Sequence, residues 1–246
     1  MKLQKLKDGD KIPGDCGHPM DAKPDWMVTE KFQRGREFFF KHTTAVVLAM
    51  NCSLAVGLSV SNLLVPLVFT GMSNTPKKSF SRYLHTFVHV ALWHYDDVWQ
   101  ADSKAHKSLE IVRSWHHSVA ARMNKHSNNA KFHFSQYDMA LVQSGFFAAV
   151  IMYPKRFGIR CSRKELEDYI FFWRGIGYLL GVSDEYNLCN GTLDEVYSVC
   201  KEIERIVLIP SLMEPPADFE MMANAIHGEI WKSWDCRRNS NATIQK

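Results

Sequence analysis

Apolar residues recur at helical spacing through most of this sequence, and no stretch alternates for long with the period of two that a half-buried β-strand shows. The clearest run is Leu109, Val112, His116, Val119 and Met123, which share one side of a helix. With 246 residues, of which 46% are hydrophobic, the chain is long enough to bury a substantial core. The pattern predicts an all-α fold built as a single large helical domain.

Punctuating residues divide the chain into segments. Residues 1 to about 25 mix Gly, Pro, Asp and Lys and predict a loop or loosely held arm. Ser162 with Glu165 forms a capping-box pattern, and Asp138 and Asp184 are expected to cap helices. We expect an arm at 1–29, a helical domain at 30–234 and a disordered tail at 235–246. The expected helices begin near residue 31 and continue through 45–69, 79–94, 109–125, 135–152, 162–180, 193–209 (ended by a proline) and 218–234.

The apolar stretch at 45–69 is long enough to cross a bilayer. Polar residues such as Asn51 interrupt it, as do Gly57 and Pro66. These interruptions favour two buried helices or one broken helix over a lipid-facing rod. A membrane anchor, or membrane contact through this stretch, remains the alternative.

Charge and cysteine usage limit the function classes. The net charge of +4 is mild and the basic residues are scattered, so nucleic acid is not an expected partner. Six widely spaced cysteines without a CxxC motif predict free thiols in a reducing compartment. Because no apolar h-region follows the charged N-terminus, we expect no signal peptide and an intracellular protein, either cytoplasmic or associated with the ER membrane. Eleven histidines point toward a cofactor.

A polar stripe marks the helix expected at 79–94. Arg82, His85, Thr86 and His89 fall at i, i+3, i+4 and i+7, so they share one face while their neighbours are mostly apolar. Such a stripe on an apolar helix suggests burial against something polar. The alternative is a stripe that faces water.

The next helix carries a histidine pair. His116 follows the apolar seam, whereas His117 lies on the flank. A histidine in a seam is commonly a structural residue with its hydrogen bonds satisfied, but a neutral imidazole on an apolar face is also what an axial haem ligand requires. His94, Asp96 and Asp97 form a weaker candidate for a divalent ion, since a hydrated helix end explains them as well. HExxH, GxSxG and P-loop motifs are absent from the sequence.

Seven short motifs occur in an order and spacing that together resemble the rubber oxygenase and ER-bound oxygenase family, which includes latex-clearing proteins and the mpaB-type oxygenase. They cover most of residues 30–230. The motifs are FQRG at 32–35, TG at 70–71, SRYLHT at 81–86, VRSWH at 112–116, QYDM at 136–139, YIFFWRGIGYLLG at 169–181 and DEYNLC at 184–189.

The resemblance implies a helical domain that encloses a haem b pocket, with His116 as the proximal iron ligand and His117 as the alternative. Arg82 and Thr86 match distal polar positions of the latex-clearing pattern. His85 stands where that pattern has a lysine, so it could ligate iron or act as an acid or base toward bound oxygen. Members of the family usually carry more helix after the point where this chain turns polar at residue 237, so a domain truncated on its C-terminal side is one interpretation.

Arg174 has two interpretations. It could pair with a carboxylate such as a haem propionate. Alternatively, its motif serves packing, because Gly177 and Gly181 allow close approach of helices.

The leading hypothesis is a haem-dependent oxygenase that uses dioxygen on a small, apolar, unsaturated or isoprenoid-like substrate. Trp115, Phe146 and Phe147 are expected to shape the substrate pocket. The rival hypotheses are a non-catalytic protein that binds haem or a hydrophobic ligand, and a small membrane-anchored protein.

Overall fold

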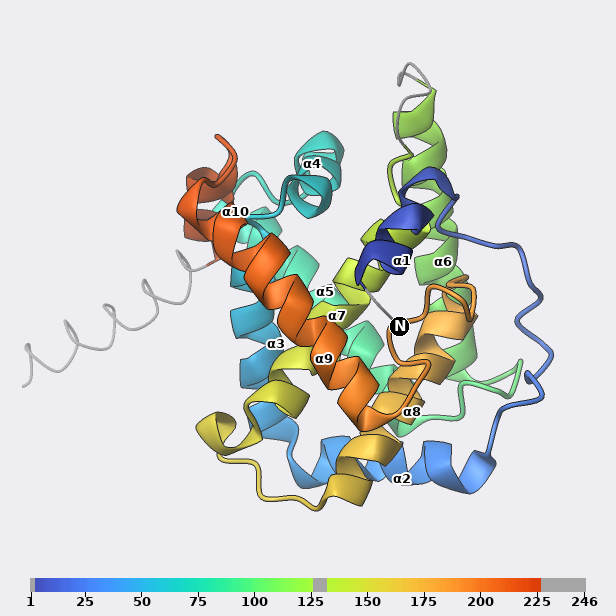
Figure 1. Cartoon of the computed structure of the whole chain (residues 1–246). Coiled ribbons are helices and arrows are strands. Elements are labelled where there is room, and N and C mark those ends of the chain that lie inside the picture. The colour runs from blue at the N-terminus through green and yellow to red at the C-terminus, as the bar shows by residue number, and fades with distance from the viewer. Residues whose placement is uncertain (1–2, 126–131, 227–246) are drawn as a thin grey trace, which may run out of the picture.

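The computed structural model describes residues 3–125 and 132–226 (Figure 1). Within these ranges the chain is helical, and the β-pairing is limited to an isolated bridge between Pro13 and Ser135. The predicted all-α fold is confirmed. The elements are α1 (Leu3–Asp8), η1 (Gly9–Lys11), α2 (Thr29–Lys41), α3 (Thr43–Gly57), α4 (Ser61–Thr70), α5 (Pro76–Tyr95), α6 (Lys104–Asn124), α7 (Gln136–Met152), η2 (Pro154–Phe157), α8 (Arg163–Leu179), α9 (Leu193–Ile203), η3 (Glu204–Leu208) and α10 (Ile209–Met213).

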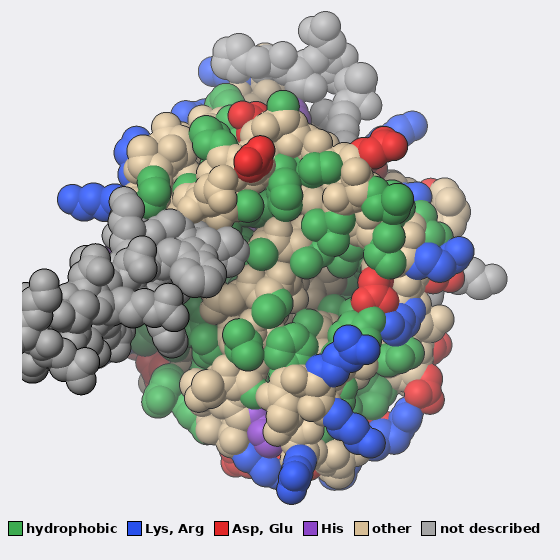
Figure 2. All heavy atoms as spheres, turned by 90° about the vertical axis from the view of Figure 1, so that its left-hand side faces the viewer, with side chains coloured by type: hydrophobic (Ala, Val, Ile, Leu, Met, Phe, Trp, Pro, Cys, Tyr) green, Lys and Arg blue, Asp and Glu red, His purple; other side chains and the backbone are tan. Residues whose placement is uncertain are grey.

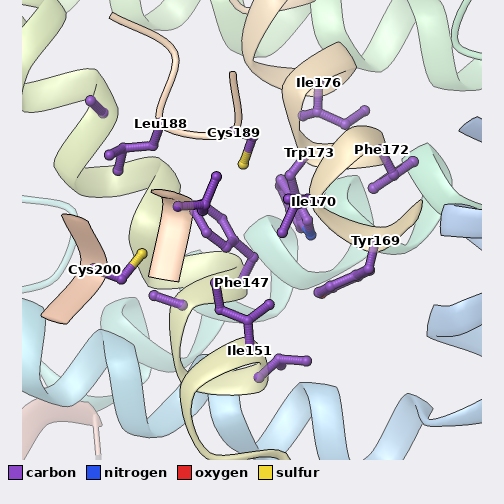
Figure 3. Packing of buried hydrophobic residues seen from close by; sticks show 14 of the residues in the cluster. Phe147, Ile151, Tyr169, Ile170, Phe172, Trp173, Ile176, Leu188, Cys189 and Cys200 are labelled. Carbon is purple, nitrogen blue, oxygen red and sulfur yellow. The ribbon is translucent and has the colours of Figure 1, made fainter. Parts of the chain in front are cut away.

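Helix α7 lies at the centre of the bundle, in contact with α3, α8 and α9 (Figure 1). It carries apolar side chains on every side, which is typical of a helix surrounded by protein. Phe147 of α7 and Tyr169, Phe172 and Trp173 of α8 are almost fully buried in the same cluster (Figure 3). Helix α2 packs along α8, and α5 packs along α6.

Local signals explain where several helices begin. Ser135 and Ser162 each accept a hydrogen bond from the backbone N–H three residues on, and the acidic residue at that position, Asp138 or Glu165, accepts one from the cap backbone. Such reciprocal bonds satisfy N–H groups that the first helical turn leaves free. The predicted capping roles of Ser162 and Asp138 are confirmed.

The apolar stretch at 45–69 forms two helices, α3 and α4, separated by a short turn, as predicted. Their burial is one-sided, since Val46 is fully buried while Leu48 of α3 is 54% exposed and Val65 of α4 is 43% exposed. Across the described ranges, no single helix has the length and apolar character to cross a membrane. The helices Thr29–Lys41 and Thr43–Gly57 meet that criterion only as a pair, and they are bent by 89° at their junction.

Two expectations about the ends of the helical region are wrong, the first of them in part. Residues 3–11 are not a loop: they form α1 and η1, α1 contacts α7 and α9, and Leu3 and Leu6 are buried. Residues 12–28 contain no helix, as expected. Pro210 does not end the helix expected at 193–209: the chain continues through the π-helix η3 into α10, and Pro210 lies in the first turn of α10.

The C-terminal expectations are tested only in part. The helix expected at 218–234 is present at residues 219–226, and Met222 is buried there. Its remainder and the tail at 235–246 lie outside the described residues. The domain boundaries after residues 29 and 234 stay predictions.

Candidate functional site

The polar stripe of α5 faces a large cavity. Thr75 caps α5 by accepting from Lys78 N–H, and Pro76 occupies the first turn. From this start, the helical repeat directs Arg82, His85, Thr86 and His89 toward a cavity of about 1010 Å³, and all four line it. His85 and Thr86 are exposed and the other two are half-buried.

The cavity lies between α3, α4, α5, α6 and α7, with η3 and α10 on one further side. Its wall is mostly apolar and includes Trp115 and Phe146. The face of the molecule that carries α3 and α10 also shows apolar side chains gathered over its middle, with charged side chains mainly toward its margins (Figure 2). Concave, largely apolar sites with a few polar groups are where proteins commonly bind small molecules.

His116 of α6 lies on the cavity wall. Its Nδ1 is buried and has no hydrogen-bond partner among the described residues. Burial, and secondarily the charge of Arg82, lowers the pKa of His116 to about 4, so the imidazole is neutral near pH 7. A neutral imidazole is the form that binds a metal. A purely structural role would require a hydrogen bond to His116 Nδ1, and the described residues provide none.

Phe134 packs beside His116, with ring centroids 5.4 Å apart. It has a φ of 56°, a left-handed conformation that is uncommon for a bulky residue. Strained backbone of this kind clusters at functional sites. This residue was not singled out in the sequence, because backbone strain leaves no simple sequence pattern.

His117 occupies a different environment from its neighbour. Its side chain is exposed and does not line the large cavity. His117 borders a smaller pocket of about 230 Å³, together with Asp15 and Arg113. His116 borders both this pocket and the large cavity. Of the pair, His116 is thus the residue that reaches the large cavity.

Arg82 is a cation at an apolar wall. Its Nη1 donates to Thr70 Oγ1 at 2.9 Å, and burial lowers its pKa. Within residues 3–125 and 132–226, no carboxylate pairs with its guanidinium. Thr86 Oγ1 donates to Arg82 O at 3.1 Å, while His89 Nδ1 lies 2.6 Å from Ser108 Oγ. Arg82 keeps N–H groups that can donate to a ligand in the cavity.

Arg174 does not line the large cavity. Its Nε and Nη2 donate to the two carboxylate oxygens of Asp184 at 2.9 and 2.6 Å, and its guanidinium lies 3.9 Å from the centre of the Trp26 ring. This bidentate pair engages Nε and Nη2 of Arg174, while its role toward a haem propionate stays a prediction. Asp184 is correspondingly an ion-pair partner rather than the expected helix cap.

The weaker metal candidate also has a structural explanation. His94 is fully buried, stacks on Phe39 and shares a hydrogen bond with Val90 O through Nδ1. Asp96 accepts from the backbone N–H groups of Asp97 and Lys104. In the part of the chain that the structure covers, no group of three or more His, Cys, Asp or Glu side chains could hold a metal ion. A haem iron needs only one or two protein ligands, so this finding leaves the haem hypothesis untouched.

Two further expectations about the cavity need correction. Phe147 does not shape the pocket, since it is 0% exposed in the core (Figure 3), whereas the adjacent Phe146 does line the cavity. Tyr153 and Glu204, which line the cavity from the ends of α7 and α9, were not predicted from the sequence. They lie 51 positions apart and carry no shared motif, so only the packing of α7 with α9 brings them together.

The described residues thus form a helical bundle around a large, mostly apolar cavity, with His116 and Arg82 on its wall. The particular family follows from comparison with known proteins: the chain belongs to the family described as "ER-bound oxygenase mpaB/B'/Rubber oxygenase, catalytic domain", whose profile matches residues 42–222. Searches of curated proteins and of solved structures gave no match. The suspected family is confirmed, and with it the general assignment to an oxygenase catalytic domain.

Proposed function

We propose that this protein is a haem-dependent oxygenase that oxidises an apolar, unsaturated substrate bound in the large cavity. The observation that carries the proposal is His116, a neutral imidazole on the cavity wall whose buried Nδ1 has no hydrogen-bond partner within residues 3–125 and 132–226. A buried polar atom without a partner is costly and calls for an explanation. Ligation of haem iron would explain both its position and its unmet bonding capacity.

The residues around the cavity fit a haem. The volume of about 1010 Å³ is at the upper end of the range for small-molecule sites, and the wall is mainly apolar, as a haem environment requires. Arg82 offers a cation that has no carboxylate partner among the described residues. It lies close enough to His116 to lower the pKa of that imidazole. When bound, the haem would supply the oxygen chemistry, which the protein groups do not provide by themselves.

The polar stripe of α5 would position the reacting molecules. Arg82 can donate hydrogen bonds to an anionic or electron-rich oxygen in the cavity, and Thr86 lies one helical turn further along the same face. His85 is exposed and lines the cavity, where its imidazole can donate or accept a hydrogen bond. Phe146, which is half-buried on the cavity wall, would help to keep water away from the substrate.

The visible absorption spectrum of the purified protein, loaded with haem, tests the proposal. We expect a Soret band that His116→Ala removes or shifts, because the iron loses its axial ligand. His117→Ala is the matched control, since it changes the adjacent histidine outside the large cavity, and its spectrum should equal that of the parent. An unchanged Soret band in His116→Ala contradicts ligation by this residue.

Turnover separates an oxygenase from a binding protein. Oxygen uptake with unsaturated lipids such as squalene should be measured on the haem-loaded protein. Uptake that disappears in His116→Ala supports the oxygenase. A protein that holds haem but consumes no oxygen with any such lipid would be a non-catalytic binding protein.

Membrane contact through residues 45–69 is a further proposal. The exposed apolar side chains Leu48, Val65 and Phe69 support it. Co-sedimentation with phospholipid vesicles is expected to decrease in the variant Leu48→Ser with Phe69→Ser. Equal sedimentation of parent and variant would contradict contact through this segment.

A further inference from the structure

A polar group interrupts the apolar wall of the cavity at the C-terminal end of α7. Tyr153 donates its hydroxyl proton to Glu204 Oε1 at 2.5 Å. Lys201 Nζ donates to the Tyr153 hydroxyl at 2.5 Å and to Glu204 Oε2 at 2.8 Å. Tyr153 and Glu204 line the cavity, whereas Lys201 is behind them and does not. The cavity therefore meets the tyrosine and the carboxylate, with the cation on the far side.

This polar group is remote from His116. Phe134, which contacts the His116 ring, comes just before α7, and Tyr153 comes just after it. Helix α7 has 17 residues, and at about 1.5 Å per residue the two ends are roughly 25 Å apart. Met139, Val142 and Phe146, spaced by three and four residues, line the cavity between those ends. The cavity thus extends along α7 between His116 and the Tyr153–Glu204 pair, and its wall is mostly apolar.

The π-helix η3 places Glu204 at this position. A π turn inserts one extra residue into a helix, so the residues after it rotate relative to those before it. Glu204 begins the π turn, and Leu208 and Leu212 after it line the cavity one helical turn apart. Such single π turns frequently mark functional sites. Here the turn joins a charged residue and an apolar ridge on one wall.

The electrostatics select the kind of head group that fits. Burial opposes ionisation of Glu204, but hydrogen bonds from Lys201 and Tyr153 outweigh it and lower the pKa of the carboxyl group. Glu204 therefore presents carboxylate lone pairs, which accept hydrogen bonds and repel anions. The Tyr153 proton is already donated to Glu204, and the guanidinium of Arg156, which does not line the cavity, lies over the Tyr153 ring. A neutral donor, a hydroxyl, is the complementary group.

We propose that Glu204 and Tyr153 bind the hydroxyl head of a long-chain alcohol whose apolar chain lies along α7 toward His116. This inference rests on the proposed function in that the cavity is taken as the substrate site, and it narrows the substrate from any apolar molecule to an amphiphile with a neutral polar end. The alcohol would be held by its head, so that the distance from head to His116 selects the position along the chain that is oxidised.

Ligand binding to the full chain tests this inference without requiring iron. Displacement of a fluorescent hydrophobic probe should be measured with dodecanol, dodecanoate and dodecane. We expect dodecanol to bind about tenfold or more tightly than either of the others, the value for one charge-assisted hydrogen bond. In Glu204→Gln the preference should reverse, because the amide can donate to dodecanoate and no longer repels it.

Two control variants and one alternative variant make the outcome decisive. Glu214→Gln and Tyr197→Phe change exposed residues outside the cavity and should keep the parent's preference. Tyr153→Phe should weaken dodecanol binding without affecting dodecane, and it replaces Glu204→Gln if that variant does not fold. Equal affinities for the three ligands in the parent, tighter binding of dodecanoate, or the same preference in Glu204→Gln and Glu214→Gln would each overturn the proposal. If the protein prefers dodecanol but does not bind haem, the haem-dependent oxygenase proposal is refuted and the proposed alcohol site stands.

Discussion

Replacement of Gly177 by alanine should destabilise the protein, although alanine is the better helix former. Gly177 lies inside α8, and a Cβ at this position would meet Gln143 Nε2 and lie 2.9 Å from Asn187 Nδ2. Both amides are buried and held in place: Gln143 Nε2 donates to Trp173 O and Asn187 Nδ2 donates to Arg174 O, each at 2.9 Å. Neither can move aside without losing a hydrogen bond.

The sign follows from the magnitudes. Replacing glycine by alanine in a helix gains about 1 kcal/mol at most. Against this, overpacking costs about 1–3 kcal/mol, and each buried amide left unpaired costs about 1–3 kcal/mol. The free energy of unfolding should therefore fall by about 2–4 kcal/mol, which lowers Tm by roughly 5–15 °C in a chain of this size.

Gly145→Ala is the matched control. Gly145 lies inside α7, and a Cβ there meets nothing within 4 Å, so this variant should be as stable as the parent or gain up to about 1 kcal/mol. Thermal and urea unfolding, followed by circular dichroism, compare the three proteins. A Gly177→Ala protein that is as stable as Gly145→Ala would refute the argument from close packing.

Three further predictions concern the titration of His94, the ion pair of Arg174 and the core residue Phe147. Burial lowers the pKa of His94 to about 3 from 6.5, so the unfolded chain binds the proton first and stability falls as pH drops from 6.5 toward 3, by up to about 1.4 kcal/mol per unit; His94→Phe should flatten this loss in urea unfolding between about pH 7 and pH 5, and equal slopes would contradict it. Arg174→Gln should lower stability by about 1–3 kcal/mol through loss of the bidentate pair with Asp184, while the haem content stays that of the parent; a folded variant with less haem would restore the propionate role. Phe147→Ala should cost about 3–5 kcal/mol in the unfolding free energy, and Phe146→Ala clearly less, since Phe146 borders a cavity; equal losses would show that both are core residues.

Most of the fold was predictable because helices are specified locally. The helical period of the apolar residues and the capping serines act over three or four positions, so they could be recognised without knowledge of any distant segment. The errors have the same origin. Residues 1–25 look polar and loop-like, but Leu6 of α1 is buried by α7 and α9, which lie far along the chain.

The candidate site divides in the same way. The shared face of Arg82, His85 and Thr86 and the position of His116 on the apolar side of its helix could be predicted, since each depends on which face of one helix a residue occupies. The ion pair of Arg174 with Asp184 could not be predicted, because it depends on how the turn that follows α8 folds back.

The amino-acid sequence by itself determined most of the helices and the faces that carry histidine and arginine. The tertiary structure alone decided that these faces meet around one cavity, that Gly177 must stay without a side chain, and that Tyr153 donates a hydrogen bond to Glu204. The physical reason is that helix formation depends on neighbours within one or two turns, whereas burial and hydrogen-bond partners depend on segments that only packing brings together.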